Sequence, residues 1–116
     1  MTIIRIKNLR LRAIIGANES ERKNKQDLVI NVVMEIDSKK ALRTDNIEDT
    51  CDYKTITKKI INHVERSKYF LLEKLAGEIL GIALEDKKVK SAAIEVDKPG
   101  ALRFSDSVSV EVSAKK

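Results

Sequence analysis

The sequence predicts an α+β domain in which two helices cover one face of a four-stranded antiparallel sheet. Near each terminus, apolar and polar residues alternate in two successive segments, which is the period of half-buried strands. Between them, apolar residues recur every three or four positions, as in amphipathic helices. The resulting β-β-α-α-β-β order lets two terminal hairpins join in one sheet with both helices on the same side. With 116 residues, the chain is expected to form a single domain over residues 1–116.

The first strand is expected between Ile3 and Ile15 and to contain a bulge. Its apolar residues change parity near Asn8, with Ile4 and Ile6 before it and Leu9, Leu11 and Ala13 after it. One extra residue in a strand returns the apolar side chains to the core, so this shift predicts a β-bulge. The opposite side of the strand carries Arg5, Lys7, Arg10 and Arg12. That basic side is either a solvated face or a wall that attracts anions.

The next elements follow from the same patterns. Residues 16–25 are polar and are interpreted as a loop, and a second strand covers residues 28–36. Residues 38–52 lack a sustained period and are interpreted as a long connection with at most a short helical turn. Asp52 can cap the helix that follows. That helix is expected to bury Ile56, Ile60 and Val64.

A second helix is expected from about Leu71 to Leu84, followed by two strands. Its inward residues are Leu72, Leu75, Ala76, Ile79, Leu80 and Ala83. Gly77 and Gly81 lie one turn apart on this helix and are interpreted as positions of close packing. The third strand covers residues 89–97. In the fourth, apolar Val108, Val110 and Val112 alternate with Ser107, Ser109 and Glu111.

Composition limits the partners of this domain. The chain has 23 Lys and Arg against 18 Asp and Glu, a net charge of +5 that favours anionic ligands. Nucleic acid is disfavoured, because the charges are dispersed and the aromatic residues that stack on bases make up only 3%. A phosphorylated small molecule accounts for the same charge. The lone Cys51 excludes an intrachain disulfide and lacks the spacing of metal ligands, so no metal is expected. No nucleotide-binding glycine loop is present, and no cofactor is expected either.

The cellular location is also constrained. The N-terminus has no apolar leader, and no apolar run approaches the roughly 20 residues of a membrane helix. A single cysteine is typical of a reducing compartment. These features predict a cytoplasmic protein that does not contact membranes.

The predicted architecture leaves one face of the sheet uncovered and both sheet edges open. Open edges are prone to aggregation unless they pair with another chain. We therefore expect a ring-like homo-oligomer closed by strand pairing between copies. Functional sites at subunit boundaries become plausible in such a ring.

Candidate catalytic and binding residues lie at the ends of the predicted elements, where small-molecule sites are assembled. Lys98 ends the third strand, directly before the only proline, and Lys is able to carry a proton. Glu21, Tyr53 and Glu73 also lie at element ends. Each has a purely structural explanation as well: surface charge, an aromatic packed at an edge, or an acid favourable to a helix dipole. Periodicity alone does not choose between these readings.

Four short segments together resemble the dihydroneopterin aldolase family of tunnelling-fold pterin enzymes. They are residues 16–21, 49–53, 71–75 and 98–101. The likeness continues almost end to end, through residues 3–12, 26–32, 57–65, 101–103 and 106–109. It implies a tunnelling fold that assembles into a barrel, as an octamer of two stacked tetrameric rings.

The resemblance also implies roles for individual residues. Glu73, with the backbone around Leu72, would hold the amino and ring N–H groups of a pterin, since a carboxylate accepts two parallel hydrogen bonds from such an edge. Tyr53 would reach the pterin from a neighbouring subunit. Lys98 and Glu21 would move protons at the side-chain hydroxyls. Main-chain groups near Ala17 and Cys51 would complete the pocket.

Two related activities follow from this resemblance. The long match favours the branch that epimerises C2′ of dihydroneopterin triphosphate, with aldolase chemistry as a side activity and Arg103 as a candidate phosphate ligand. The Lys98–Ala101 turn resembles the aldolase branch at least as closely. That branch forms 6-hydroxymethyl-dihydropterin and glycolaldehyde for folate synthesis. A third alternative, from a different class, is a non-catalytic ring that binds anions or nucleic acid through its basic first strand.

Overall fold

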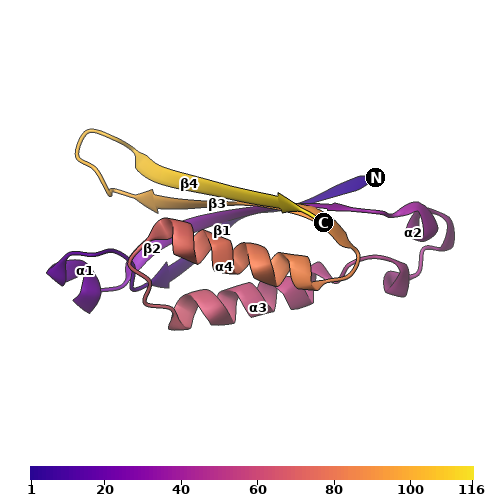
Figure 1. The fold of residues 1–116 in the computed structure, drawn as a ribbon, viewed down its shortest axis with the longest axis horizontal. Coiled ribbons are helices and arrows are strands. Elements are labelled where there is room, and N and C mark those ends of the chain that lie inside the picture. Colours follow the sequence, from indigo (N-terminus) through magenta and orange to yellow (C-terminus); the bar gives the residue numbers. More distant parts are fainter.

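The computed structural model describes residues 1–116 and has the predicted two-layer architecture (Figure 1). The sheet has the order β1-β2-β3-β4, and every neighbouring pair is antiparallel. Its strands are β1 (Thr2–Ala13), β2 (Gln26–Ile36), β3 (Val89–Pro99) and β4 (Ser107–Lys115). Helices α3 (Tyr53–Arg66) and α4 (Leu72–Glu85) cover one face of the sheet. The predicted fold class is therefore confirmed.

The hydrophobic core lies between the sheet and the two long helices. On α3, the buried residues are Ile56, Ile60 and Val64, as expected from their four-residue spacing. On α4 they are Leu75, Ala76, Ile79 and Ala83. Alternate residues of β2 and β3 meet them from the sheet, which leaves the other sheet face without a covering layer.

The bulge in β1 occurs where the apolar pattern changes parity. Pairing with β2 shifts register between Ile6 and Leu9, and Asn8 takes a left-handed backbone conformation with φ of 54°. Asn tolerates that conformation better than most residues. The Asn8 N–H donates to Oδ1 of Asn31 on β2 at 2.9 Å, so the extra residue still has a partner. Leu9 and Leu11 return to the helix side of the sheet because of this bulge.

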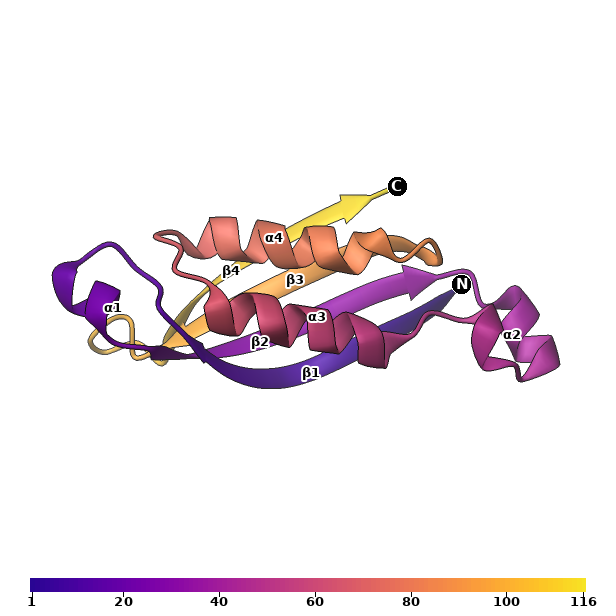
Figure 2. The same cartoon turned by 90° about the horizontal axis from the view of Figure 1, so that it is seen from below.

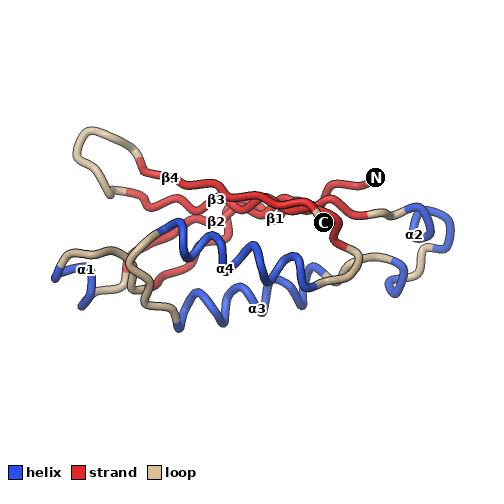
Figure 3. The backbone as a smooth tube through the Cα atoms, viewed as in Figure 1, coloured by secondary structure: helices blue, strands red, loops and turns tan.

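Three short helices interrupt segments that the sequence predicts as connections. Helix α1 (Glu19–Lys23) lies within the predicted loop 16–25, which corrects that prediction. Helix α2 (Lys39–Thr44) and the 3₁₀ turn η1 (Ile47–Asp49) fill the connection before α3. Figure 3 shows α1 and α2 at opposite ends of the molecule.

The glycines of α4 do not have the predicted role. A Cβ added at Gly77 or Gly81 would meet no atom within 4 Å, and both residues lie on the exposed side of the helix. The expectation of close packing is therefore wrong within one chain. That side of α4 is left open to solvent.

The connections gather at two ends of the elongated domain (Figure 2). We call the end that contains α1 and the α3–α4 and β3–β4 connections the α1 end. The end that contains α2, the start of α3 and both termini is the α2 end. No helix combines the length and the apolar character needed to cross a membrane.

Candidate active site

A sheltered ion pair joins two candidate residues that lie 77 positions apart in the sequence. The Nζ of Lys98, at the end of β3, contacts Oε2 of Glu21 on α1. Their side chains are only 13% and 18% exposed, unlike those of the other ion pairs, in each of which at least one partner is more than half exposed. Partial burial strengthens the attraction between the two charges. The contact therefore forms a sheltered charged pair between α1 and the end of β3.

Glu21 is held in place by its own helix. It forms a capping box with Asn18: the Glu21 N–H donates to Oδ1 of Asn18 at 2.9 Å, and the Asn18 N–H donates to Oε1 of Glu21 at 3.3 Å. Gln26 donates to Oε2 of Glu21 at 3.2 Å and to the Ile15 carbonyl at 2.6 Å. The hydrogen bond from Lys98 is the largest cause that lowers the pKa of Glu21, although partial desolvation opposes it.

The Glu21 carboxylate occupies space that Gly16 leaves open. Gly16 is buried and has a φ of 115°, a conformation that side chains rarely adopt. A Cβ at this position would overlap the carboxyl group of Glu21. Gly16 also donates its N–H to the Tyr69 carbonyl at 3.2 Å. Only glycine satisfies the backbone and the close approach at once.

Arg22 fastens α1 to the connection between α3 and α4. Its guanidinium donates to the carbonyls of Gly16 and Tyr69 at 3.1 Å each and to that of Lys68 at 2.6 Å. It also lies over the ring of Phe70, 4.0 Å from the ring centroid. Because α4 begins directly after this connection, Arg22 fixes the position of Glu21 relative to the first turn of α4.

Glu73 lies in that first turn, at the same end of the molecule as Lys98 and Glu21. Glu73 is exposed and Leu72 is half-buried. No side chain caps this helix, so its first backbone N–H groups remain free for a ligand. Nearby, Nε2 of His63 lies 2.8 Å from the Tyr69 hydroxyl, which gives this lone histidine a hydrogen-bonded packing role.

Tyr53 and Cys51 lie at the opposite end of the domain. Tyr53 is the first residue of α3 and is 52% exposed, and Asp52 caps the helix by accepting from the N–H groups of Lys54 and Thr55. Cys51 is buried, and desolvation raises the pKa of its thiol. Within one chain, these residues therefore do not meet Lys98, Glu21 or Glu73 (Figure 2).

The remaining candidates, Ala17 and Arg103, lie at the α1 end. Ala17 is exposed between β1 and α1. Arg103 lies in the exposed β3–β4 connection, with its guanidinium 5.1 Å from the centroid of the Phe104 ring. The structure thus brings five candidates to one end, namely Lys98, Glu21, Glu73, Ala17 and Arg103.

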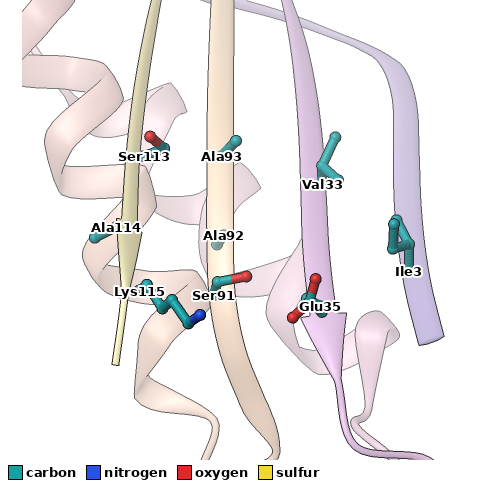
Figure 4. Close-up of a pocket in the computed structure, with 9 residues that line it drawn as sticks. All are labelled: Ile3, Val33, Glu35, Ser91, Ala92, Ala93, Ser113, Ala114 and Lys115. Atoms are coloured by element: carbon teal, nitrogen blue, oxygen red, sulfur yellow. The ribbon is translucent and has the colours of Figure 1, made fainter. Parts of the chain in front are cut away.

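No enclosed pocket surrounds these residues in a single chain. A hollow of about 530 Å³ lies on the uncovered sheet face and includes Ile3, Val33, Glu35 and Lys115 (Figure 4). A smaller hollow of about 340 Å³ lies beside Pro99. Neither is lined by Lys98, Glu21 or Glu73. The site at the α1 end is open where a second chain could cover it.

Comparison with known proteins identifies the family. The sequence model of the dihydroneopterin aldolase family matches residues 4–113. This chain belongs to the dihydroneopterin aldolase family. The match spans both hairpins and both long helices, so it includes every candidate residue described above.

Individual members of the family are similar over nearly their whole length. Dihydroneopterin triphosphate 2′-epimerase of Escherichia coli is 50% identical over 111 residues, covering 96% of this chain and 92% of that protein. The epimerase of Pseudomonas aeruginosa is 46% identical over 113 residues, covering 97% and 92%. Escherichia coli dihydroneopterin aldolase in complex with neopterin has the same fold, with a TM-score of 0.92, 29% identity, and coverage of 98% and 99%.

Sequence reasoning missed the residues that support the site. The sequence pattern of a capping box, Asn18 followed by Glu21, indicates the start of a helix, but the polar composition of the segment favoured a loop. Gly16, Arg22 and Gln26 carry no comparable local signal, because their partners are distant in sequence or belong to the backbone. Arg22 in particular could not be distinguished from the other surface cations.

The Glu21 interactions predict a pH-dependent contribution to stability. Glu21→Gln should lower the free energy of unfolding by about 1–3 kcal/mol at pH 7, because the charged hydrogen bonds are lost. The pKa of Glu21 is lowered in the folded state, so its contribution is present above the ordinary value of 4.5 and disappears as pH falls through the folded value. Denaturant unfolding should therefore show a gap in stability between wild type and variant that is present at pH 7 and narrows as the pH is lowered below 4.5.

A neighbouring acid provides the control. Glu19 forms an exposed pair with Lys23, and Glu19→Gln should change stability by no more than about 0.5 kcal/mol at either pH. An equal effect of the two substitutions at pH 7 would contradict the structural role of Glu21.

Proposed function

We propose that this protein epimerises 7,8-dihydroneopterin triphosphate at C2′ to give 7,8-dihydromonapterin triphosphate, with some aldol cleavage as a side reaction. The observation that carries the proposal is the sheltered Lys98–Glu21 pair, which lies at the same end of the domain as Glu73. The sequence identity of 46–50% to two epimerases supports the choice of reaction.

Glu73 and the backbone provide the pterin-binding groups in this proposal. The Glu73 carboxylate accepts hydrogen bonds from the 2-amino group and the adjacent ring N–H, a paired geometry that matches its two oxygens. The free N–H groups of the first turn of α4, near Leu72, contact acceptor atoms of the ring. Backbone groups at Ala17 and, from another copy, at Cys51 close the pocket around it.

The reaction uses the dihydropterin ring as its own electron sink. Lys98 first gives a proton from its ammonium group to solvent water, and the neutral amine then takes the proton of the 2′-hydroxyl group, directly or through a water, while Glu21 positions that proton path. The C2′–O bond becomes an aldehyde carbonyl, the C1′–C2′ bond breaks, and its electron pair moves into the ring C=N bond to give an enamine. Turning of the aldehyde and re-addition to C1′ inverts C2′. Proton transfer to C1′, assisted by Tyr53, releases the aldehyde instead.

Retention of the aldehyde decides between the two outcomes. A triphosphate held by cations keeps the fragment close to the enamine, so that re-addition is faster than escape. Arg103 is the proposed phosphate ligand, because it is exposed in the β3–β4 connection that begins two residues after Lys98. The net charge of +5 is compatible with a polyphosphate substrate.

A complete site requires more than one copy of the chain. Tyr53 and Cys51 lie at the α2 end, so they act on a pterin bound at the α1 end only in a neighbouring subunit.

Helix α3 packs over β1, and α4 packs over β3 and β4. If β1 of one copy follows β4 of the next, α3 of one copy lies beside the open side of α4 of the other. Strand tilt in a closed barrel displaces neighbours along the strands. The proposed octamer of two tetrameric rings requires this displacement to bring Tyr53 of one copy toward Glu73 of the next.

Aldol cleavage as the main activity is the second candidate. The solved Escherichia coli aldolase that shares this fold is in complex with neopterin, which has no phosphate. The same residues would then act on dihydroneopterin, with 6-hydroxymethyl-7,8-dihydropterin and glycolaldehyde as products.

Product analysis distinguishes the two activities. The purified protein is incubated separately with dihydroneopterin and with its triphosphate, and pterins and glycolaldehyde are quantified by chromatography. We expect the 2′-inverted triphosphate to form faster than any aldehyde is released. Rapid release of glycolaldehyde from dihydroneopterin, with no inverted triphosphate, would establish the aldolase instead. Absence of turnover with either compound would contradict both.

Lys98 should be essential for turnover and not for folding. Lys98→Ala removes the proposed proton carrier, and we expect kcat to fall by about 10²–10⁴-fold, the range for loss of a general acid–base group. Lys90→Ala, at an exposed position near the start of the same strand, serves as the matched control and should retain activity. Full activity of a folded Lys98→Ala protein would refute the assignment.

Glu73 should govern affinity for the pterin ring. Glu73→Ala removes the paired acceptor, and we expect the Kd for neopterin in equilibrium binding to rise at least about tenfold, as for loss of hydrogen bonds to a charged group. Glu65→Ala, at an exposed position on α3, is the control. Unchanged affinity after Glu73→Ala would remove Glu73 from the site. If affinity then fell steeply with salt, a general anion-binding surface would be favoured.

A further inference from the structure

A hollow lined only by charged side chains lies at the α2 end, away from the Lys98–Glu21 pair (Figure 2). We call it the lysine hollow, because five of its eight lining residues are lysines and the other three are acids. It measures about 480 Å³, and its lining comes from residues 37–40, 48–49 and 87–90. These segments are the start of α2, the turn η1 and the connection from α4 into β3. No step of the proposed reaction uses this hollow.

Internal contacts hold the three segments of the lysine hollow together. The Asp49 side chain is only 13% exposed, because its carboxylate contacts Nζ of Lys40 at 3.4 Å and accepts from the Thr44 hydroxyl at 2.5 Å. Nζ of Lys88 donates to the Glu48 carbonyl, which joins the connection after α4 to η1. The walls are therefore already in place, and a ligand does not have to order them at a cost in entropy.

Positive charge exceeds negative charge in the lining. One ion pair, between Lys40 and Asp49, compensates itself. Of the other six lining residues, four are lysines and two are acids, and none of the six forms an ion pair within the chain. Ammonium groups that share one hollow repel one another, and a bound anion relieves that repulsion. The surplus of two positive charges favours a ligand with at least two negative charges.

The lining also selects the chemistry of the ligand. Sites for organic ring systems are mostly apolar or aromatic, with a few polar groups. The lysine hollow has no apolar side chain, so it does not suit a pterin ring or a nucleobase. Lysine ammonium groups bind phosphate oxygens as point charges with three donors each. The volume of about 480 Å³ is larger than a single phosphate group fills, so several linked phosphates match it best.

We propose that the lysine hollow binds an oligophosphate chain, at a site separate from the candidate active site. Lys39 of α2 and Lys87 of the connection after α4 donate to the phosphate oxygens from different segments. Lys40 remains paired with Asp49. The chain is either free or one end of a larger molecule whose remainder lies in solvent, because the lining offers no wall for a ring. This site does not depend on the reaction proposed above.

Calorimetric titration with inorganic triphosphate tests the site. The wild type should bind it saturably, and more weakly as salt is raised, because charge dominates the contact. Lys39→Ala with Lys87→Ala removes one donor from each of two segments, and we expect the Kd to rise at least about tenfold, as for loss of hydrogen bonds to a charged group. Both residues are exposed, and circular dichroism verifies the fold. Lys87→Ala alone is used if the double variant does not fold.

Two controls separate this site from other cations. Lys7→Ala with Lys58→Ala removes the same charge from exposed positions that do not line the hollow, and the Kd should stay within about twofold of the wild-type value. Arg103→Ala removes the phosphate ligand proposed for the reaction, and binding that depends on Lys39 and Lys87 should persist in that variant. Failure of the proposed reaction therefore leaves this test interpretable.

The same titration with ATP distinguishes the two sources of the chain. ATP carries a triphosphate with a nucleoside at one end. Equal affinity for ATP and inorganic triphosphate would indicate that the chain of a larger molecule is bound while its remainder lies in solvent. Affinity for ATP that is at least about tenfold weaker would indicate a free chain as the ligand. Both results support the site if the affinity depends on Lys39 and Lys87.

Three results would overturn the inference. The first is the absence of saturable binding of inorganic triphosphate by the wild type at low salt. The second is an unchanged Kd in the folded Lys39→Ala and Lys87→Ala double variant. The third is an equal loss of affinity in the Lys7→Ala and Lys58→Ala control, as expected if only the net charge of the protein attracts the anion.

Discussion

The ion pair between Glu21 and Lys98 is the contact on which the α1 end of this domain depends. It joins the first connection of the chain to the end of the third strand. Several unusual local features hold the Glu21 carboxylate in position for this contact. The Asn18 cap orients the carboxylate, and Gly16 leaves room for it. Arg22 binds the carbonyls of Gly16 and Tyr69 and so holds α1 at a fixed position relative to the start of α4. The distant segments that carry the candidate residues are therefore held together largely through backbone carbonyls.

Much of the fold could be predicted from the sequence, whereas the contacts of the site could not. The four-residue spacing of Ile56, Ile60 and Val64 and the parity change near Asn8 report directly on burial, and both are confirmed. Helix α1 was missed because its sequence is entirely polar and only its cap marks it. The meeting of Glu21 with Lys98 depends on tertiary packing, which periodicity does not encode. Only the resemblance to a known family predicted that Glu21 and Lys98 act at the same site.

Tyr53 is separated from the other candidate residues within one chain. A single copy therefore contains all the candidate residues but does not bring them together. Tyr53 begins α3 at the α2 end because Asp52 caps the helix there, and the length of α3 then fixes its distance from α4's first turn. The side of α4 that carries Gly77 and Gly81 is likewise open to solvent in one chain. A site that includes Tyr53 therefore needs a second copy of the chain, as in the proposed assembly.

The Arg22 clamp has a consequence for motion. Because one guanidinium holds the carbonyls of Gly16, Lys68 and Tyr69, the α1 segment and the α3–α4 connection cannot open independently without breaking shared hydrogen bonds. Segments coupled in this way behave as one cooperative unit in native-state fluctuations. Amide protons of both segments that exchange through this opening should then report the same free energy of opening.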